Sequence, residues 1–302
     1  SINLPSSINN IGDEAFKNNT SMVSVSIPDS VKSIGDSAFY GCTSLLGVVI
    51  PDSVEKTGRC AFQKCSKLAS AYLPVNEKFT YMNAYMFESC TSLKKIEIPD
   101  NVTNIGLEAF ENCTELSSVI LSKNLKTIGG RAFENDNKLT EIEIPKSLEE
   151  CSNGYGYGQP TGIVGGAFQN CANLKTVTFE EGTTEIAEAL FAGCTGIEQI
   201  KIPDTVTVIE SGAFGGCINL TEIEIPDSVT KIERAAFGYC SSLKEIELSE
   251  NLESMGAYAF QNCNVLKNIV IPDSVTNIEL EAFENCTELS NVILSKNLKT
   301  IG

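Results

Sequence analysis

The 302-residue sequence contains no histidine and no tryptophan. Histidine is the commonest general base and metal ligand near neutral pH, so its absence removes the usual starting point for an active site. Cofactor signals are missing as well. The glycine-rich run at 154–158 lacks the spacing and the lysine of a phosphate-binding loop, and no two cysteines have the Cys-x-x-Cys spacing of a zinc site. We therefore expect no enzymatic activity, no cofactor and no metal.

Positive charge is also scarce, because 22 lysine and arginine residues face 39 aspartate and glutamate residues, for a net charge of −17. Such a surface repels phosphate backbones, so we expect neither nucleic acid nor an anionic membrane as a partner. No apolar run approaches the roughly 18 residues that span a bilayer, which predicts no membrane insertion. Hydrophobic residues nevertheless make up 42% of the chain, enough to fill a core.

What the sequence does contain is one unit repeated from end to end. A phenylalanine, usually preceded by alanine, recurs every 23 residues, with two longer intervals of 25 and 35 residues. A period in the twenties is typical of a solenoid, in which each repeat forms one rung that packs only against its neighbours. We expect a single solenoid over residues 1–302, with insertions near 75–86 and 146–166 and with both ends cut within a repeat, so that the native protein is longer. The rungs are named by their phenylalanines: Phe16, Phe39, Phe62, Phe87, Phe110, Phe133, Phe168, Phe191, Phe214, Phe237, Phe260 and Phe283.

Each repeat predicts a strand, an extended piece and a helical turn. In the rung of Phe39, residues 45–50 place apolar side chains at the first, fourth and sixth places, and the last three places alternate as in a half-buried strand. A proline usually follows and ends the strand. The Ala-Phe pair and the cysteine three residues after the phenylalanine form an i, i+3, i+4 patch that predicts about one helical turn, ended by a glycine or asparagine in the left-handed conformation. The expected fold class is an α/β solenoid with one long parallel sheet and short helical turns.

Ten of the twelve cysteines occupy the place three residues after the phenylalanine, where the remaining rungs have Asn19 and Asp136. A residue that recurs once per rung in an apolar phase forms a core column, in which a free cysteine acts as a small hydrophobe. Neighbouring rungs lie roughly 5 Å apart, but side chains stacked in register run parallel to each other. We predict buried free thiols, with rung-to-rung disulfides as the alternative. Cys60 and Cys151 lie outside the column, and Cys151, in the long insertion, is a candidate for pairing between chains.

The run Leu-x-x-Ile-x-Ile-Pro followed by Val-x-x-Ile-Gly-x-x-Ala-Phe-x-x-Cys resembles the BspA-type leucine-rich repeat over essentially the whole chain. The resemblance implies a right-handed leucine-rich superhelix of about twelve repeats, secreted or on a bacterial or protist cell surface, often an adhesin for matrix or host proteins or for other cells. It implies no catalytic residues. The departures from the pattern are the two long repeats, Glu180, and a serine at the proline place: Ser122, Ser249 and Ser295.

Outward places of the strands are the candidate ligand surface. Val49 and Tyr72 fall at the fifth place of neighbouring strands, and Ile120 falls at the same place two rungs further on. The long insertion has the glycine and proline content of a loop, and its Tyr155 and Tyr157 are further candidate contacts, unless the loop is simply a tolerated disordered insertion.

Acidic side chains also recur at outward places and suggest a cation site as one interpretation. For the glutamate pairs we expect a solvated face balanced by Lys175, Lys201 and Lys244. For the aspartates after the prolines we expect carboxylates that bond to the backbone of their own turn. The glutamate pairs are Glu141 with Glu143, Glu222 with Glu224, and Glu245 with Glu247, and the aspartates are Asp29, Asp52, Asp100, Asp204, Asp227 and Asp273.

Two functional hypotheses remain open. Segments 101–129 and 274–302 are almost identical, which indicates block duplication and favours a protein whose length and surface area matter. The first hypothesis is a monomeric adhesive module that binds extracellular proteins or glycans. The second is a structural spacer without a ligand of its own. The varied, partly apolar outward places favour binding.

Overall fold

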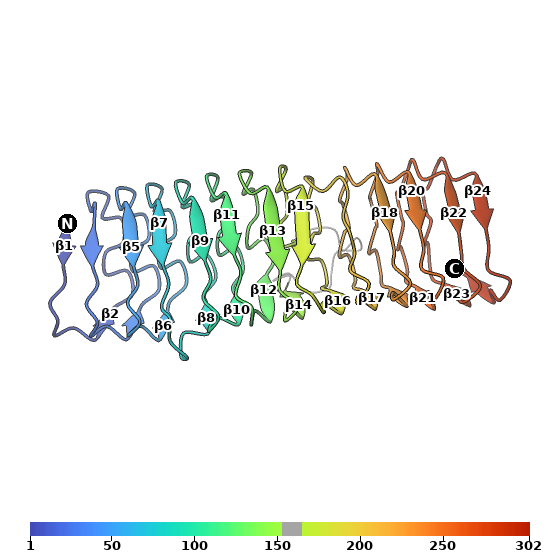
Figure 1. The fold of residues 1–302 in the computed structure, drawn as a ribbon. Helices are drawn as coiled ribbons and strands as arrows, with labels where there is room; N and C mark the ends of the chain where they lie inside the picture. The colour runs from blue at the N-terminus through green and yellow to red at the C-terminus, as the bar shows by residue number, and fades with distance from the viewer. Residues whose placement is uncertain (153–164) are drawn as a thin grey trace. The chain divides into compact units, whose positions relative to one another are not determined.

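The computed structural model describes residues 1–152 and 165–302, which form two compact units, Ser1–Leu148 and Glu149–Gly302. Each unit is a stack of rungs in which parallel strands of two to four residues alternate with turns (Figure 1). The predicted parallel solenoid is therefore confirmed within each unit, and its continuity from one unit to the other stays a prediction.

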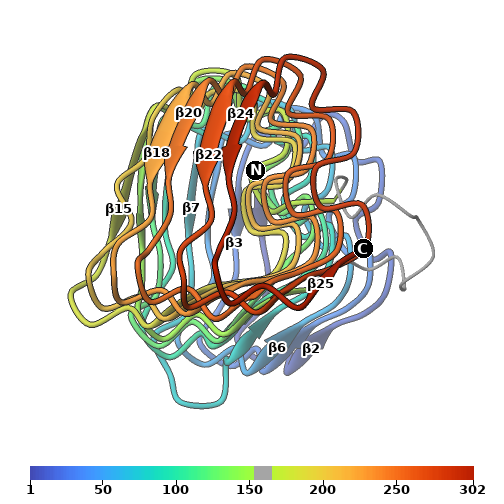
Figure 2. The ribbon, with the colours of Figure 1, turned by 90° about the vertical axis from the view of Figure 1, so that its right-hand side faces the viewer.

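Two ladders of strands follow adjoining sides of the rungs (Figure 2). We call the ladder built from the strands after the cysteines the strand face, and the ladder built from the short pieces before the phenylalanines the second ladder. In Ser1–Leu148 the strand face contains β1 (Ile2–Asn3), β3 (Val25–Ser26), β5 (Gly47–Val49), β7 (Ser70–Tyr72), β9 (Lys95–Glu97), β11 (Ser118–Ile120) and β13 (Glu141–Ile144). Its second ladder contains β2 (Asn10–Ile11), β4 (Ser33–Ile34), β6 (Lys56–Thr57), β8 (Tyr81–Met82), β10 (Asn104–Ile105) and β12 (Thr127–Gly129).

The same two ladders recur in Glu149–Gly302. Its strand face contains β15 (Thr176–Phe179), β18 (Glu222–Glu224), β20 (Glu245–Glu247), β22 (Asn268–Val270) and β24 (Asn291–Ile293). Its second ladder contains β14 (Glu150–Ser152), β16 (Glu185–Ile186), β17 (Val208–Ile209), β19 (Lys231–Ile232), β21 (Ser254–Met255), β23 (Asn277–Ile278) and β25 (Thr300–Ile301).

The strand face is not the one long sheet that the repeat predicts. Its strands bond in pairs, β1 with β3, β5 with β7 and β9 with β11 in the first unit, and β18 with β20 and β22 with β24 in the second. The second ladder is more continuous, since β16, β17, β19, β21, β23 and β25 form one six-stranded sheet. Three-residue strands offer few ladder bonds, and flanking groups add further backbone bonds between rungs, as in Leu46 N to Val23 O at 3.1 Å.

The described residues contain no helix, so the expected helical turns and the α/β class were wrong. Around Phe39, the backbone is left-handed at both Ser37 (φ 53°) and Gly41 (φ 68°). The glycine or asparagine before the cysteine has the conformation that was predicted, but the second left-handed residue, four places earlier, is incompatible with a right-handed helical turn. The N–H groups bond to the next rung instead, as in Phe39 N to Ala61 O at 2.8 Å.

The phenylalanines form the main core column of each unit. Successive rings are stacked with centroids 5.1–5.6 Å apart in Ser1–Leu148 and 5.4–5.8 Å apart in Glu149–Gly302. The column members from Phe39 to Phe260 have no exposed surface. The predicted burial of this column is confirmed, and offset stacking adds to the energy of burying each ring.

Cysteines form a second column of buried free thiols, as predicted. The thiol of Cys240 donates to the Phe214 carbonyl of the preceding rung at 3.2 Å, and most of the column repeats this bond. Cys151 is 2% exposed in β14, so the expectation of an exposed thiol that pairs between chains was wrong. It takes the inward place that isoleucine holds in most other rungs of the second ladder. Burial raises the pKa of Cys151 to about 12.

Thiol titration tests this arrangement. After denaturation without a reductant, we expect at least the ten column cysteines to react with a thiol reagent. In the folded protein only the partly exposed Cys60 and Cys286 should react readily, because burial protects the other thiols and thiolates are the reactive form. A count of two or fewer thiols in the denatured protein would contradict the prediction.

One place in the cysteine column holds a carboxylic acid. Asp136 has no exposed surface, and neither of its carboxyl oxygens has a hydrogen-bond partner among the described residues. The Cys113 N–H group faces this carboxyl but donates to the Phe110 carbonyl at 3.1 Å. Burial therefore raises the pKa of Asp136 well above its ordinary value, and we expect the carboxyl to stay protonated in the folded protein.

Candidate functional site

The strand face presents side chains that the core does not use. In β5, Val48 is 3% exposed whereas Val49 is 61% exposed. Strands β7, β9, β18, β20 and β22 also place a buried residue between two outward ones. Successive side chains of a strand point to opposite faces, so the predicted outward direction of the fifth place is confirmed.

Apolar side chains gather on this face in the first unit. Val49 and Tyr72 are register partners in β5 and β7, and Tyr72 is 59% exposed. Ile120 in β11 is 57% exposed and has Glu97 as its register partner in β9. The structure therefore brings Val49 and Tyr72 side by side, while a charged residue occupies the same place on the rung between Tyr72 and Ile120. Tyr155 and Tyr157 lie outside the described residues.

The strand face of the second unit is interrupted at the rung of Phe191, which the sequence pattern did not predict. Residues 197–202 keep the apolar places of a strand but form none. Within the part of the chain that the structure describes, no backbone hydrogen bond joins Gln199–Ile202 to a neighbouring rung. By contrast, Ile225 N of the next rung donates to Glu247 O at 2.9 Å.

Gly196 lies at the start of this interruption. A Cβ atom at Gly196 would lie 2.5 Å from the Cys171 carbonyl oxygen and 2.6 Å from Leu174 N, both on the preceding rung. Any other residue would therefore force the two rungs apart. The rung of Phe191 packs closely against its predecessor at this point, and its strand segment leaves the ladder.

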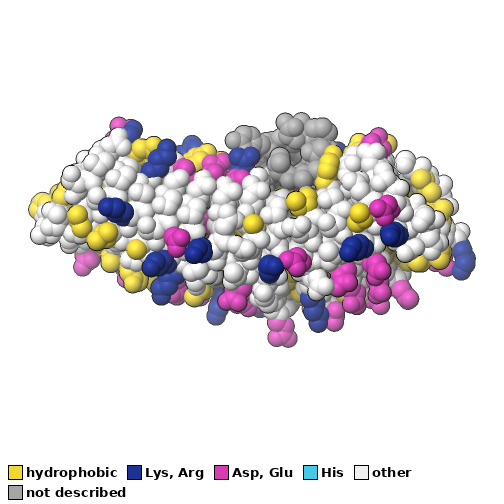
Figure 3. Space-filling view, turned by 90° about the horizontal axis from the view of Figure 1, so that it is seen from above, with side chains coloured by type: hydrophobic (Ala, Val, Ile, Leu, Met, Phe, Trp, Pro, Cys, Tyr) yellow, Lys and Arg dark blue, Asp and Glu magenta, His cyan; other side chains and the backbone are white. Residues whose placement is uncertain are grey.

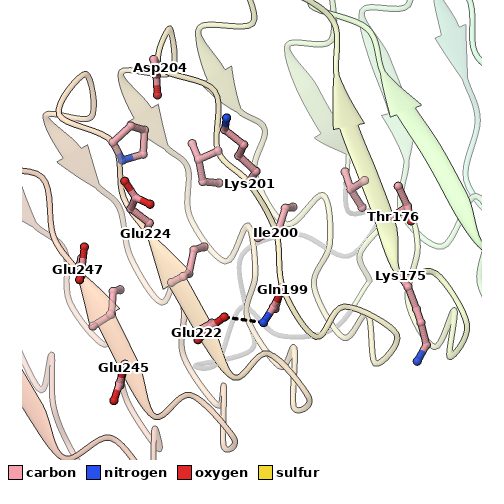
Figure 4. A pocket seen from close by; sticks show the side chains of 15 residues that line it. Lys175, Thr176, Gln199, Ile200, Lys201, Asp204, Glu222, Glu224, Glu245 and Glu247 are labelled. Carbon is pink, nitrogen blue, oxygen red and sulfur yellow. Dashed lines mark hydrogen bonds between the residues drawn. The ribbon is translucent and has the colours of Figure 1, made fainter.

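A hollow of about 760 Å³ lies over the interruption (Figure 4). Fourth-place side chains contribute to its lining, and two of them, Val177 and Ile200, are half-buried. Most other rungs bury the same place, as in Ile96 and Ile269 (2% exposed), although Val119 is half-buried too. The floor of the hollow is therefore formed by apolar side chains at inward-facing places of the strands.

Charge around the hollow is uneven. Four exposed glutamates line the side of β18 and β20, and they form two register pairs, Glu222 with Glu245 and Glu224 with Glu247. Among the described residues no ion pair reaches any of the four, and Gln199 Nε2 donates to Glu222 Oε1 at 2.5 Å (Figure 4). In Figure 3, acidic side chains gather along one edge of the half that holds this unit.

The lysines expected to balance these glutamates do not reach them. Lys175 forms an ion pair with Glu198 at 2.6 Å instead. Lys201 also lines the hollow and forms no ion pair within the described ranges (Figure 4). The solvent exposure of the glutamates is confirmed, but their expected neutralisation was wrong, because Lys175 pairs with Glu198 of the next rung, and neither Lys201 nor Lys244 forms an ion pair among the described residues.

Most of the aspartates after the prolines accept hydrogen bonds from the next rung. Asp52 Oδ1 accepts a hydrogen bond from Val75 N at 2.7 Å, and Asp100 Oδ1 accepts one from Lys123 N at 2.9 Å. The expected bonds within their own turns were therefore wrong for these residues, because stacking in register brings the next rung's N–H group within reach. No group of three or more cysteine, aspartate or glutamate side chains in the described ranges could hold a metal ion. The described residues also contain no helix that is long and apolar enough to cross a membrane.

Three similar solved structures come from bacteria. The chain is similar to a leucine rich cell surface protein from Faecalibacterium prausnitzii A2-165, with 29% identity over 97% of this chain and 87% of that chain and a TM-score of 0.57. A leucine-rich repeat protein from Bacteroides ovatus is 26% identical over 93% of this chain and 82% of that chain, with a TM-score of 0.58. The pneumococcal vaccine antigen PcpA, at 20% identity over 98% and 72% of the two chains and a TM-score of 0.57, shares the fold.

Comparison of sequences gives the family. No curated protein matches the chain significantly. The family described as "BspA type Leucine rich repeat region (6 copies)" matches residues 1–113, 48–155 and 161–290. These matches cover most of the chain, and the strand, phenylalanine and cysteine places that they contain are those that build the rungs. The chain therefore belongs to the BspA-type leucine-rich repeat family.

Proposed function

We propose that the protein is a non-enzymatic binding module, secreted or displayed on the cell surface, that mediates adhesion to host or neighbour-cell proteins or glycans. The observation that carries this proposal is the pair Val49 and Tyr72, two large apolar side chains exposed side by side on the strand face. The family and the cell-surface description of the similar Faecalibacterium prausnitzii protein support the location.

A rigid scaffold makes such a pair effective in binding. Single exposed apolar residues are ordinary, but neighbouring ones offer a continuous area that a partner can cover. Tyrosine is enriched at interfaces because it combines a large ring with a polar hydroxyl and loses little conformational entropy on binding. The backbone beneath Tyr72 is already ordered by the ladder between β5 and β7, so binding costs little further ordering.

Binding should depend on Tyr72. Immobilised extracellular matrix proteins, a glycan array and intact host cells would be screened with the full chain, and each positive ligand would then be tested with Tyr72→Ala. We expect this substitution to weaken binding by about tenfold or more, as for an aromatic residue near the centre of an interface. Because Tyr72 is exposed, the melting temperature should not change.

Tyr81→Ala is the matched control, since Tyr81 is 46% exposed but lies in β8 of the second ladder. It should leave binding unchanged. Equal losses for both variants would place the contact elsewhere than the strand face. A full chain that binds none of these ligands would favour the spacer hypothesis.

A further inference from the structure

We propose that the hollow between β15 and β18 binds an extended segment of a partner protein in which lysine or arginine side chains flank an apolar side chain. This inference rests on the proposed binding function, but it assigns a second surface, in the second unit, and a chemical class of partner. Val49 and Tyr72 take no part in it.

The floor of the hollow provides the apolar contact. Val177 and Ile200 are half-buried where most other rungs bury the same place, so a ligand side chain that covers them removes further apolar surface from water. Burial of such surface contributes about 25 cal/mol per Å². A volume of about 760 Å³ has room for a short peptide segment but not for a folded element.

The interrupted ladder provides polar contacts for a backbone. Residues Gln199–Ile202 line the hollow, and within the described ranges their N–H and C=O groups have no partner on a neighbouring rung. Such groups bond to water or to a ligand, since they are rarely left unpaired. An extended peptide carries the alternating donors and acceptors that satisfy unpaired strand groups, as in peptides that add to a sheet.

The four glutamates determine which charge the partner must carry. Glu222 with Glu245 and Glu224 with Glu247 place like charges directly opposite each other, an arrangement that destabilises a strand pair. No ion pair of the described residues relieves this repulsion. Lysine or arginine side chains of a ligand would relieve it through charge-assisted hydrogen bonds, whereas an acidic segment or a nucleic acid would be repelled. The cations of the ligand are therefore expected over β18 and β20.

Three acetylated and amidated peptides test the proposal by calorimetric titration into the full chain. Lys-Leu-Lys-Val-Lys combines both features, Lys-Gly-Lys-Gly-Lys keeps only the charge, and Glu-Leu-Glu-Val-Glu keeps the apolar residues but reverses the charge. We expect the first to bind at least about tenfold more tightly than the second, and the third not to bind. Equal affinities for the first two would overturn the assignment of the floor.

The variant E222Q/E224Q/E245Q/E247Q removes four carboxylates at exposed places, so it should fold normally. It should weaken binding of Lys-Leu-Lys-Val-Lys by about tenfold or more. The control E77Q/E97Q/E141Q/E143Q makes the same change of charge at exposed places of the first unit and should bind like the wild type. Equal losses in both variants would show diffuse attraction to an acidic chain and overturn the site. Failure here would leave the Tyr72-dependent binding untouched, so the two proposals are tested separately.

Discussion

Phe214→Ala should lower the free energy of unfolding by about 3–5 kcal/mol. Phe214 has no exposed surface and lies between the rings of Phe191 and Phe237, with centroids 5.6 and 5.4 Å away. Removal of its ring leaves a cavity inside a column that close neighbours on both sides prevent from collapsing. Urea unfolding followed by circular dichroism measures the loss.

Phe283→Ala is the matched control. It removes the same ring from the same column, but Phe283 is half-buried and its ring stacks on Phe260 at 5.6 Å. Less surface returns to water and less of a cavity forms, so we expect less than half the loss seen for Phe214→Ala. Similar losses for both variants would show that the cost does not come from packing within the column.

Asp136→Cys should stabilise the protein. It replaces a buried carboxyl group without a hydrogen-bond partner among the described residues by the residue that the column uses elsewhere. An unsatisfied buried polar group costs about 1–3 kcal/mol, and we expect the substitution to recover a gain of this order even at low pH. Urea unfolding at a series of pH values would measure it.

The gain from Asp136→Cys should grow as the pH rises. Burial raises the pKa of Asp136 in the folded protein above the unfolded value of about 3.9. Below that value the carboxyl is protonated in both states and contributes no pH dependence. Above it the unfolded chain loses the proton while the folded chain keeps it, so stability falls by about 1.4 kcal/mol per pH unit until the pH reaches the folded-state pKa. The variant lacks this slope.

Cys113→Asp provides the reverse experiment one rung earlier, where the native thiol is fully buried and donates to the Phe87 carbonyl at 3.2 Å. It should destabilise the protein and steepen the fall of stability between pH 4 and pH 7. Parallel pH profiles for the wild type and Asp136→Cys would mean that the Asp136 carboxyl is ionised in the folded protein, contrary to the prediction.

Much of this protein is determined by its sequence, because burial repeats with the same period as the residue types. The apolar first, fourth and sixth places, the phenylalanine column and the cysteine column all follow from the 23-residue spacing. The outward direction of Val49, Tyr72 and Ile120 follows from the strand alternation alone. Even the burial of Cys151 could have been predicted from the sequence, since Cys151 stands three residues after Leu148, as Ile34 stands after Val31.

The tertiary structure decided how the backbone groups are bonded. An i, i+3, i+4 patch indicates a helical turn only if the N–H groups bond within the segment, and here Phe39 N bonds to Ala61 O on the next rung. The hollow has the same origin. Residues 197–202 repeat the strand pattern but form no strand, and among the described residues Gln199–Ile202 have no backbone hydrogen bond to a neighbouring rung. Side-chain burial is a property of one repeat and is visible in its residue types, whereas backbone pairing depends on how two rungs meet, and only the folded stack specifies that.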